Sequence, residues 1–388
     1  MFTYIKRNLK HMDKFLLFLS TILFIWGLLS IVSSSSRVAV LDYNLPVYHY
    51  FIQQLKMIGI GLFAGFIIIN IPSEKYWFWV QLAFVIILGI LLYLSFTGDD
   101  TRGAQNWVRL FGFTFQPSEF SKPIVIVYLS MIFERFYKVL RSPKENHNEI
   151  LAWIIFVGCF IPAIVFFQKD FGTMMILLII FGVLFWASPI RKENKWKMTG
   201  VLLITVILGA GIMYKNKGYI LSNAQLARFD FYNPCSKYET GGYQICNGFI
   251  AINDGGLLGL GLGKSKQKYS YIPEPHTDSI FSIIAEENGF IRSSFAFLFY
   301  IALLYRIITL SLQATTIRGK FICLGVATYI FAHIFINLGG LFGMIPLTGV
   351  PLPFFSYGGS FTISLICSLA LVQRVYIENK MKPVFNKK

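Results

Sequence analysis

The sequence predicts an all-helical membrane protein that crosses the bilayer about ten times. Of its 388 residues, 55% are apolar and only 14% are charged, whereas charged residues make up roughly a quarter of an ordinary soluble domain. The mean hydropathy is +0.60, and the apolar residues gather into runs that approach the roughly 20 residues needed for a membrane helix. This composition excludes an ordinary cytosolic enzyme and a disordered chain.

Ten apolar runs follow one another along the chain. A backbone within lipid must satisfy its own hydrogen bonds, so each run is predicted to be a helix. The runs cover residues 16–31, 57–71, 77–97, 123–133, 151–167, 171–190, 201–214, 293–305, 321–338 and 361–373. We interpret residues 1–388 as a single integral membrane domain with one large loop, residues 215–277, between the seventh and eighth spans.

The distribution of Lys and Arg predicts the side that each loop faces. With the N-terminus in the cytoplasm, the inner segments hold 21 of the 35 Lys and Arg residues and the short outer loops hold five. Membrane proteins carry this excess in their cytoplasmic loops, so both termini are predicted to be cytoplasmic. The net charge of +16 then follows from topology and does not predict a nucleic-acid partner.

The five cysteines divide by location. Cys159, Cys323 and Cys367 fall in predicted spans, where a thiol usually packs as a small hydrophobe. Cys235 and Cys246 share the large outer loop, where a disulfide is permitted if the loop lies outside the cytoplasm. The sequence leaves two alternatives for this pair, a disulfide and two free thiols.

Three segments on the predicted outer face are too polar, or too rich in glycine and proline, to be plain connectors. They are residues 98–122, 271–289 and 339–360. The last is irregular yet apolar and uncharged, and such a segment enters a membrane only where it lines a cavity or packs on protein. We expect the loops 98–122 and 339–360 to line a shared cavity that opens outward.

Two sets of charged residues in these segments allow both a structural and a functional interpretation. Asp278 precedes an apolar run, so it is either a helix cap or a carboxylate that takes a proton from a sugar hydroxyl. Glu119 and Lys122 lie on one face of a helix because they are three residues apart. They form a buried ion pair, or Lys122 faces the phosphates of an anionic lipid, and both statements can hold.

Trp107 and His276 also allow both a structural and a functional interpretation. Trp107 is either an anchor at the membrane interface or a ring that stacks on a sugar. His276 is either a hydrogen-bonded structural residue or a base.

Five motifs in order along the chain resemble the SEDS family of bacterial shape, elongation, division and sporulation proteins. They are GAQNW at 103–107, QPSEFSK at 116–122, QKDFGT at 168–173, PEPHTD at 273–278 and PLTGVPLPFFSYGGS at 346–360. The resemblance extends over about residues 15–377 and is closer to the FtsW and SpoVE branch than to the RodA branch. The chain departs from the family at Ser279, where Phe is usual, and at Phe361, where Ser or Thr is usual.

The resemblance implies a peptidoglycan glycosyltransferase of the bacterial cytoplasmic membrane. Such an enzyme polymerises lipid II on the extracytoplasmic face, in cell division or in cell-shape maintenance. The implied partners are the lipid II substrate, a class B penicillin-binding protein and other membrane proteins of the divisome or elongasome. The alternative functions are a lipid II flippase and a non-catalytic divisome scaffold.

The resemblance also implies roles for individual residues. Asp278 would be catalytic, as a base or as a carboxylate that orients the acceptor, and Lys122 would lie near the pyrophosphate. The other residues expected at the substrate are Trp107, Glu119, Gln116, His276, Glu274, Arg109, Asp170 and Ser356. No cage of several carboxylates is visible in the sequence, so the one cofactor considered is a divalent cation, Mg or Mn, near Asp278 that bridges phosphates.

Overall fold

The computed structural model describes residues 2–97, 107–110, 113–142, 148–215, 231–269 and 271–381. Nearly all of the N-terminal part is helical. Its elements are α1 (Phe2–Lys10), α2 (Lys14–Arg37), η1 (Val38–Asp42), α3 (His49–Asn70), η2 (Ser73–Lys75), α4 (Tyr76–Thr97), β1 (Val108–Leu110), β2 (Phe113–Phe115), α5 (Pro117–Arg135), α6 (Tyr137–Arg141), α7 (Asn148–Phe167), α8 (Phe171–Ala187) and α9 (Lys192–Lys215).

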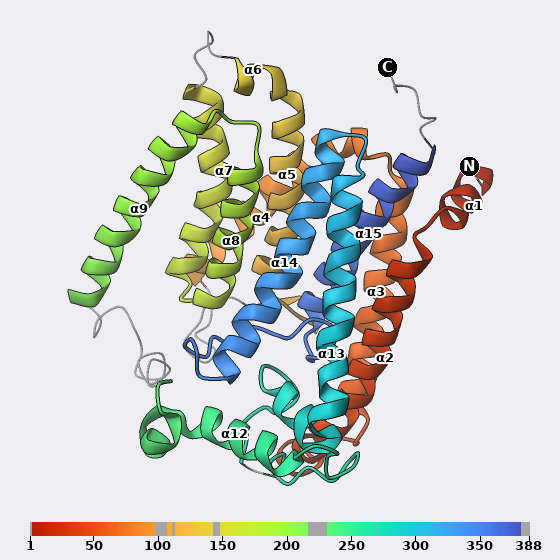
Figure 1. The fold of residues 1–388 in the computed structure, drawn as a ribbon, viewed down its shortest axis with the longest axis vertical. Helices are drawn as coiled ribbons and strands as arrows, with labels where there is room; N and C mark the ends of the chain where they lie inside the picture. The colour runs from red at the N-terminus through yellow and green to blue at the C-terminus, as the bar shows by residue number, and fades with distance from the viewer. Residues whose placement is uncertain are drawn as a thin grey trace.

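The C-terminal part begins with short helices in the large loop and ends with three long ones. Its elements are η3 (Pro234–Lys237), η4 (Tyr238–Gly242), α12 (Tyr243–Gly255), α13 (Ile280–Leu312), α14 (Ile317–Leu341) and α15 (Gly359–Met381). Figure 1 shows α1 and the end of α15 at one end of the bundle, and α12 at the opposite end.

The structure confirms a multi-pass helical membrane protein. Each predicted span coincides with a helix, apart from a few terminal residues. Seven helices of the described chain are long and apolar enough to cross a membrane: Lys14–Asp42, His49–Asn70, Ser73–Thr97, Asn148–Phe167, Ile280–Leu312, Ile317–Leu341 and Gly359–Met381. The total of ten stays a prediction, because α5, α8 and α9 are not among these seven; α8 is shorter, and α5 carries Glu119, Lys122 and Glu134.

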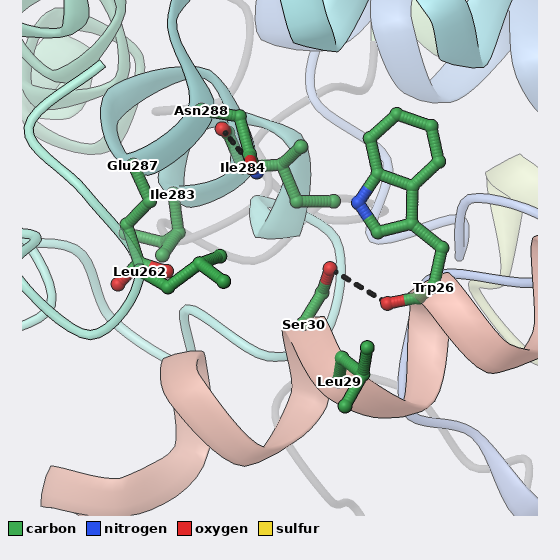
Figure 2. Close-up of a pocket in the computed structure, with 8 residues that line it drawn as sticks. All are labelled: Trp26, Leu29, Ser30, Leu262, Ile283, Ile284, Glu287 and Asn288. Atoms are coloured by element: carbon green, nitrogen blue, oxygen red, sulfur yellow. Dashed lines mark hydrogen bonds between the residues drawn. The ribbon is translucent and has the colours of Figure 1, made fainter.

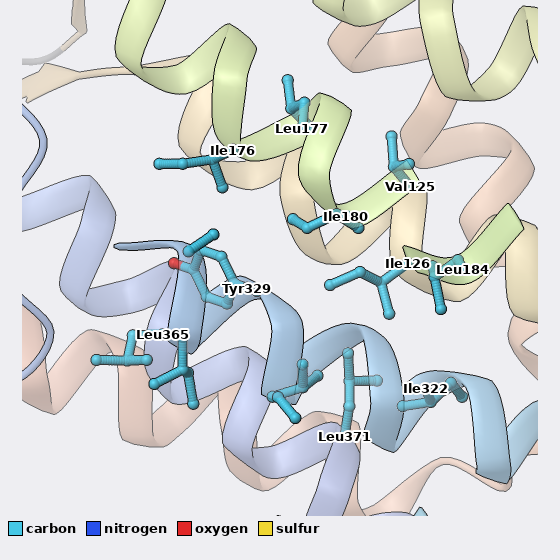
Figure 3. Packing of buried hydrophobic residues seen from close by; sticks show 14 of the residues in the cluster. Val125, Ile126, Ile176, Leu177, Ile180, Leu184, Ile322, Tyr329, Leu365 and Leu371 are labelled. Atoms are coloured by element: carbon cyan, nitrogen blue, oxygen red, sulfur yellow. The ribbon is translucent and has the colours of Figure 1, made fainter. Parts of the chain in front are cut away.

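The helices α5, α14 and α15 lie in the core of the bundle. In their most apolar stretches, 78% of α14 and 89% of α15 is buried. Figure 3 shows Ile126 of α5, Ile180 of α8, Tyr329 of α14 and Leu365 of α15 among the packed side chains. Helices that are apolar on all sides suit such a position, and α5 brings its charged residues into it.

The segment between α14 and α15 folds back into the bundle. Phe355 is fully buried, and the Tyr300 hydroxyl of α13 donates a hydrogen bond to the carbonyl of Pro353. Asn337 Nδ2 of α14 donates to the Val350 carbonyl at 2.8 Å. These contacts confirm that the uncharged segment packs on protein, which supplies its carbonyls with donors.

The helix α13 is interrupted where the loop after α12 meets it. Gly289 has φ of +73°, outside the helical region, and the Phe290 N–H donates to the Gly256 carbonyl at 2.8 Å. A Cβ on Gly289 would lie 2.3 Å from the backbone nitrogen of Gly259. Only glycine fits this crossing, because the φ is left-handed and the two backbones touch.

We expect Gly289→Ala to lower the free energy of unfolding by at least about 1–3 kcal/mol, the usual cost of a non-glycine residue in a strained backbone conformation. The measurement is the thermal unfolding midpoint of the purified protein in detergent. Gly182→Ala in α8 is the matched control, because a Cβ there meets nothing within 4 Å and alanine favours a helix. Equal midpoints for the two variants would show that Gly289 is replaceable.

Candidate functional site

Asp278 lies in the loop before α13 and does not cap it. The helix begins at Ile280 with Ser279 as its N-cap, so the interpretation of Asp278 as the helix cap is wrong. The reason is that the carbonyls of Thr277 and Asp278 are held in the loop. Asn337 Nδ2 donates to the Asp278 carbonyl at 2.7 Å, and Ser356 Oγ donates to the Thr277 carbonyl at 2.6 Å.

Asp278 is partly exposed, and the neighbours of its carboxylate come from three segments. Gln244 Nε2 of α12 and the Thr277 hydroxyl each lie 3.3 Å from Oδ1. A Cβ on Gly349, which has φ of +75°, would lie 4.0 Å from Oδ2. Sequence reasoning missed Gln244, because an amide in a loop carries no pattern that predicts a contact 34 residues away.

The turn between α7 and α8 and the third polar segment both bind Gln116, which belongs to the first polar segment. Asp170 is the N-cap of α8, and its Oδ1 accepts from the Thr173 N–H at 3.0 Å. Its Oδ2 accepts from Gln116 Nε2 at 2.8 Å, and the Gln116 N–H donates to Ser360 Oγ at 2.9 Å. The predicted convergence of the polar segments is therefore seen in these contacts, while the shared cavity stays a prediction.

Ser356 is buried and holds the loop before α15 in shape. Its hydroxyl accepts from the Leu352 N–H at 2.8 Å and donates to the Thr277 carbonyl. Both hydrogen-bonding functions of this hydroxyl are thus used within the protein. The observed role of Ser356 is to fix the residue before Asp278.

Lys122 lies inside the bundle, on α5. Its ammonium donates to Glu119 Oε1 at 2.6 Å and lies 3.1 Å from His333 Nε2 on α14. The Tyr329 ring has its centroid 5.8 Å from the ammonium, a favourable cation–π distance. The ion pair expected from the spacing is present, and Lys122 is 0% exposed.

His333 extends this pair into a chain of contacts, and sequence reasoning missed it. An ammonium has only donors, so Nε2 of His333 must accept, and Nδ1 is left to donate to the Pro351 carbonyl at 3.2 Å. The imidazole also stacks on Phe361, with 4.5 Å between the ring centroids. The departure from the family at Phe361 therefore lies against the partner of Lys122.

His276 is buried in a group of aromatic rings. It is 1% exposed, and its ring centroid lies 4.4 Å from that of Tyr50 on α3 and 5.6 Å from that of Tyr357. Glu274 Oε2 lies 3.9 Å from His276 Nε2. Burial and the Glu274 carboxylate raise the pKa of the Tyr357 hydroxyl, which therefore stays protonated at neutral pH.

Trp107 and Arg109 lie at a short hairpin that the sequence did not predict. The strands β1 and β2 pair antiparallel, with Arg109 opposite Thr114. Trp107 precedes β1 and is 41% exposed, as both an interfacial anchor and a sugar-stacking ring require. The Arg109 side chain lies outside the described part of the structure, so its predicted contact with substrate is not tested.

Cys235 and Cys246 form a disulfide, which decides between the two alternatives that the sequence left open. The bond joins η3 to the first turn of α12 and closes a separation of 11 residues. Cys159, Cys323 and Cys367 are free thiols, as expected for cysteines in spans.

Among the described residues, no group of three or more His, Cys, Asp or Glu side chains could hold a metal ion. Divalent cations such as Mg²⁺ take several oxygen ligands. A cation beside Asp278 would therefore need ligands from substrate phosphates and water, and it stays a prediction.

A separate cavity of about 180 Å³ lies between α2, α13 and the loop that follows α12. Figure 2 shows Trp26 and Leu29 of α2 facing Leu262 and Ile284 across it. Glu287 forms one wall and is paired with Lys268 at 3.2 Å. The cavity contains none of the predicted site residues, so it is distinct from the site around Asp278.

A family model, that of the cell cycle proteins FtsW, RodA and SpoVE, matches residues 13–381. The chain is 34% identical to the probable peptidoglycan glycosyltransferase FtsW of Bacillus subtilis (strain 168), over 97% of this chain and 95% of that protein. It is 32% identical to the stage V sporulation protein E of the same organism, over 94% of this chain and 96% of that protein.

Two solved structures share the fold. A chain of a peptidoglycan synthase complex that coordinates polymerization and crosslinking superposes with a TM-score of 0.73 at 22% identity, over 96% of this chain and 99% of that chain. The rod shape determining protein RodA of Thermus thermophilus superposes with a TM-score of 0.67 at 21% identity, over 96% of this chain and 98% of that chain. At these identities the likeness concerns the arrangement of the helices.

Proposed function

Because the chain belongs to the family of cell cycle proteins FtsW, RodA and SpoVE, we propose that it is a peptidoglycan glycosyltransferase that extends glycan strands from lipid II. The observation that carries this proposal is the position of Asp278, a carboxylate at the meeting point of the loop before α13, α12 and the Gly349 segment. The relatives named as glycosyltransferases match 97% and 78% of this chain, and they support an activity in division or cell shape.

The proposed reaction joins two lipid-linked sugars. Asp278 takes a proton from, or orients, the acceptor 4-hydroxyl, whose oxygen attacks the anomeric carbon of the donor. The new glycosidic C–O bond forms as the bond from that carbon to the pyrophosphate oxygen breaks, and undecaprenyl pyrophosphate leaves. Hydrogen bonds at both ends of Asp278 favour catalysis, because a pre-oriented base needs no reorganisation at the moment of reaction.

Lys122 is proposed to stabilise the departing pyrophosphate through its positive charge. Direct contact would require its ammonium to leave Glu119 and His333, since the side chain is fully buried. Gln116 and Asp170 are the N-caps of α5 and α8, and Trp107 precedes β1. All three are proposed to contribute to the sugar-binding surface. Arg109, Glu119, Glu274, His276 and Ser356 are proposed members of the same site or of its supporting shell.

The proposed topology has ten spans, cytoplasmic termini and an active site on the extracytoplasmic face of the bacterial membrane. The position of α1 and the end of α15 opposite α12 supports it (Figure 1), as does the excess of Lys and Arg in the predicted inner segments. The proposed partner is a class B penicillin-binding protein, because the similar solved chain belongs to a complex that couples polymerization to crosslinking.

The test is polymerisation of lipid II by the purified protein together with its class B partner. We expect glycan strands that are absent without the protein. Transport of lipid II across a proteoliposome membrane without polymer would favour the flippase. A complex that assembles with its partner but neither transports nor polymerises would favour the scaffold, and either result would contradict the proposal.

A further inference from the structure

Asp278 is held at both ends by amide side chains from different helices. Asn337 of α14 binds its backbone carbonyl. Gln244, at the second position of α12, donates through Nε2 to Ser279 Oγ at 2.8 Å and to Asp278 Oδ1 at 3.3 Å. A primary amide carries two N–H groups, so a single Gln244 amide serves both acceptors and fixes the direction of the carboxylate.

The start of α12 is itself fastened to η3, in two ways. Cys246 follows Gln244 by two residues, is buried, and is bonded to Cys235 with 5.0 Å between the Cα atoms. At Gly242, the residue before α12, a Cβ would lie 1.9 Å from the Pro234 carbonyl oxygen. The covalent bond and the close backbone contact together limit how far Gln244 can move from Asp278.

We propose that Gln244 is a positioning residue for Asp278 and that the Cys235–Cys246 disulfide holds Gln244 in place. This inference rests on the proposed role of Asp278 in the reaction. Hydrogen bonds to an ionised carboxylate are roughly twice as strong as neutral ones. A reacting group displaced by about 1 Å can lose about 10²-fold in rate. The disulfide therefore contributes to turnover through geometry.

Two variants of equal length test the donor. Gln244→Met removes both N–H groups and keeps the unbranched chain, and we expect kcat for lipid II polymerisation to fall about tenfold, as for a lost hydrogen bond to a charged group. Gln244→Glu turns a carboxylate toward Asp278, and we expect a larger fall, about 100-fold, since like charges at this distance repel. KM should change less than about twofold in both, because the role assigned to Gln244 is orientation rather than substrate binding.

Asn247 supplies the matched control on the same helix. Its buried amide donates to the Tyr271 carbonyl at 3.0 Å and to the Tyr238 hydroxyl at 3.4 Å. We expect Asn247→Leu to lower the thermal midpoint while kcat stays within about twofold of the native value, because these bonds lie within the loop. Gln244→Met should instead lower kcat and leave the thermal midpoint close to that of the native protein. A loss of midpoint in Gln244→Met that accounts for its loss of kcat would assign Gln244 a structural role only.

The role of the disulfide is tested by combining its removal with Gln244→Met. Cys235→Ser with Cys246→Ser should lower kcat several-fold in the native background and little further in Gln244→Met, because coupled residues are not additive. An equal fold decrease in kcat in both backgrounds would show that the disulfide acts independently of Gln244, and it would overturn that part of the proposal. Asp278→Asn is measured in parallel. If it is inactive while Gln244→Met turns over normally, the positioning role fails alone, whereas an active Asp278→Asn removes the proposed function of Asp278 and this inference with it.

Discussion

Asp278→Asn is expected to reduce lipid II polymerisation by about 10²–10⁴-fold, the usual contribution of a general acid or base. The loss should fall on kcat, because the amide has the size of the carboxylate but cannot take a proton. Asn337 binds the backbone carbonyl of residue 278 and not its side chain, so the loop geometry should survive the change. The measurement is single-turnover polymerisation with the partner present, alongside the thermal midpoint.

Asp254→Asn is the matched control for this result. Asp254 lies near the C-terminal end of α12, in the large loop that ends next to Asp278. The substitution therefore removes one negative charge from the same end of the bundle. Activity close to the native value is expected for this control. If both variants lost activity equally, the charge of the loop rather than the Asp278 carboxylate would be responsible. If neither variant lost activity, Asp278 would not be the base.

The helices could be predicted from the sequence because hydrophobic length is a local property. All ten apolar runs fall in helices apart from a few terminal residues, and the Glu119–Lys122 pair followed from a spacing of three residues on one helix. The five motifs that resemble the family could be found for the same reason, since the residues of each motif are contiguous. These inferences depend only on neighbours in the chain.

The missing parts of the site depend on residues that are distant in the sequence. His333 reaches Lys122 across 211 positions and Gln244 reaches Asp278 across 34, and no periodicity links either pair. Asp278 is not the N-cap of α13, because hydrogen bonds from α14 and from the loop before α15 keep Thr277 and Asp278 out of the helix. Local capping preferences cannot anticipate such tertiary restraints.

The contact that breaks α13 at Gly289 escaped prediction for a related reason. The outer segment predicted from the sequence ends at residue 289 and the predicted span begins at residue 293, but nothing in the sequence predicts what separates them. The interruption arises because the backbone of the loop after α12 crosses there and bonds to α13. A single glycine in a helical pattern is ordinarily tolerated. The requirement for glycine at position 289 can therefore be seen only from its close backbone contact with Gly259.

Lys122→Met is expected to lower the free energy of unfolding by about 3–5 kcal/mol, the cost of removing one partner of a buried ion pair. The substitution leaves the Glu119 carboxylate inside the bundle without its ammonium. Of the side chains that the structure describes, none donates to Glu119 Oε2, so no second donor takes over. The thermal midpoint in detergent reports the loss. A midpoint equal to that of the native protein would contradict the pairing.

The double variant Lys122→Met, Glu119→Gln separates the two roles assigned to Lys122. Removing both charges should restore most of the midpoint, because a neutral pair of similar volume is often as stable as the buried ion pair it replaces. With stability recovered, activity reports on the loss of the two charges rather than on unfolding, and a loss of about 10²–10³-fold in kcat is expected for a missing electrostatic stabiliser. Native activity in the recovered double variant would make Lys122 a structural residue, whose positive charge serves to neutralise Glu119 within the membrane.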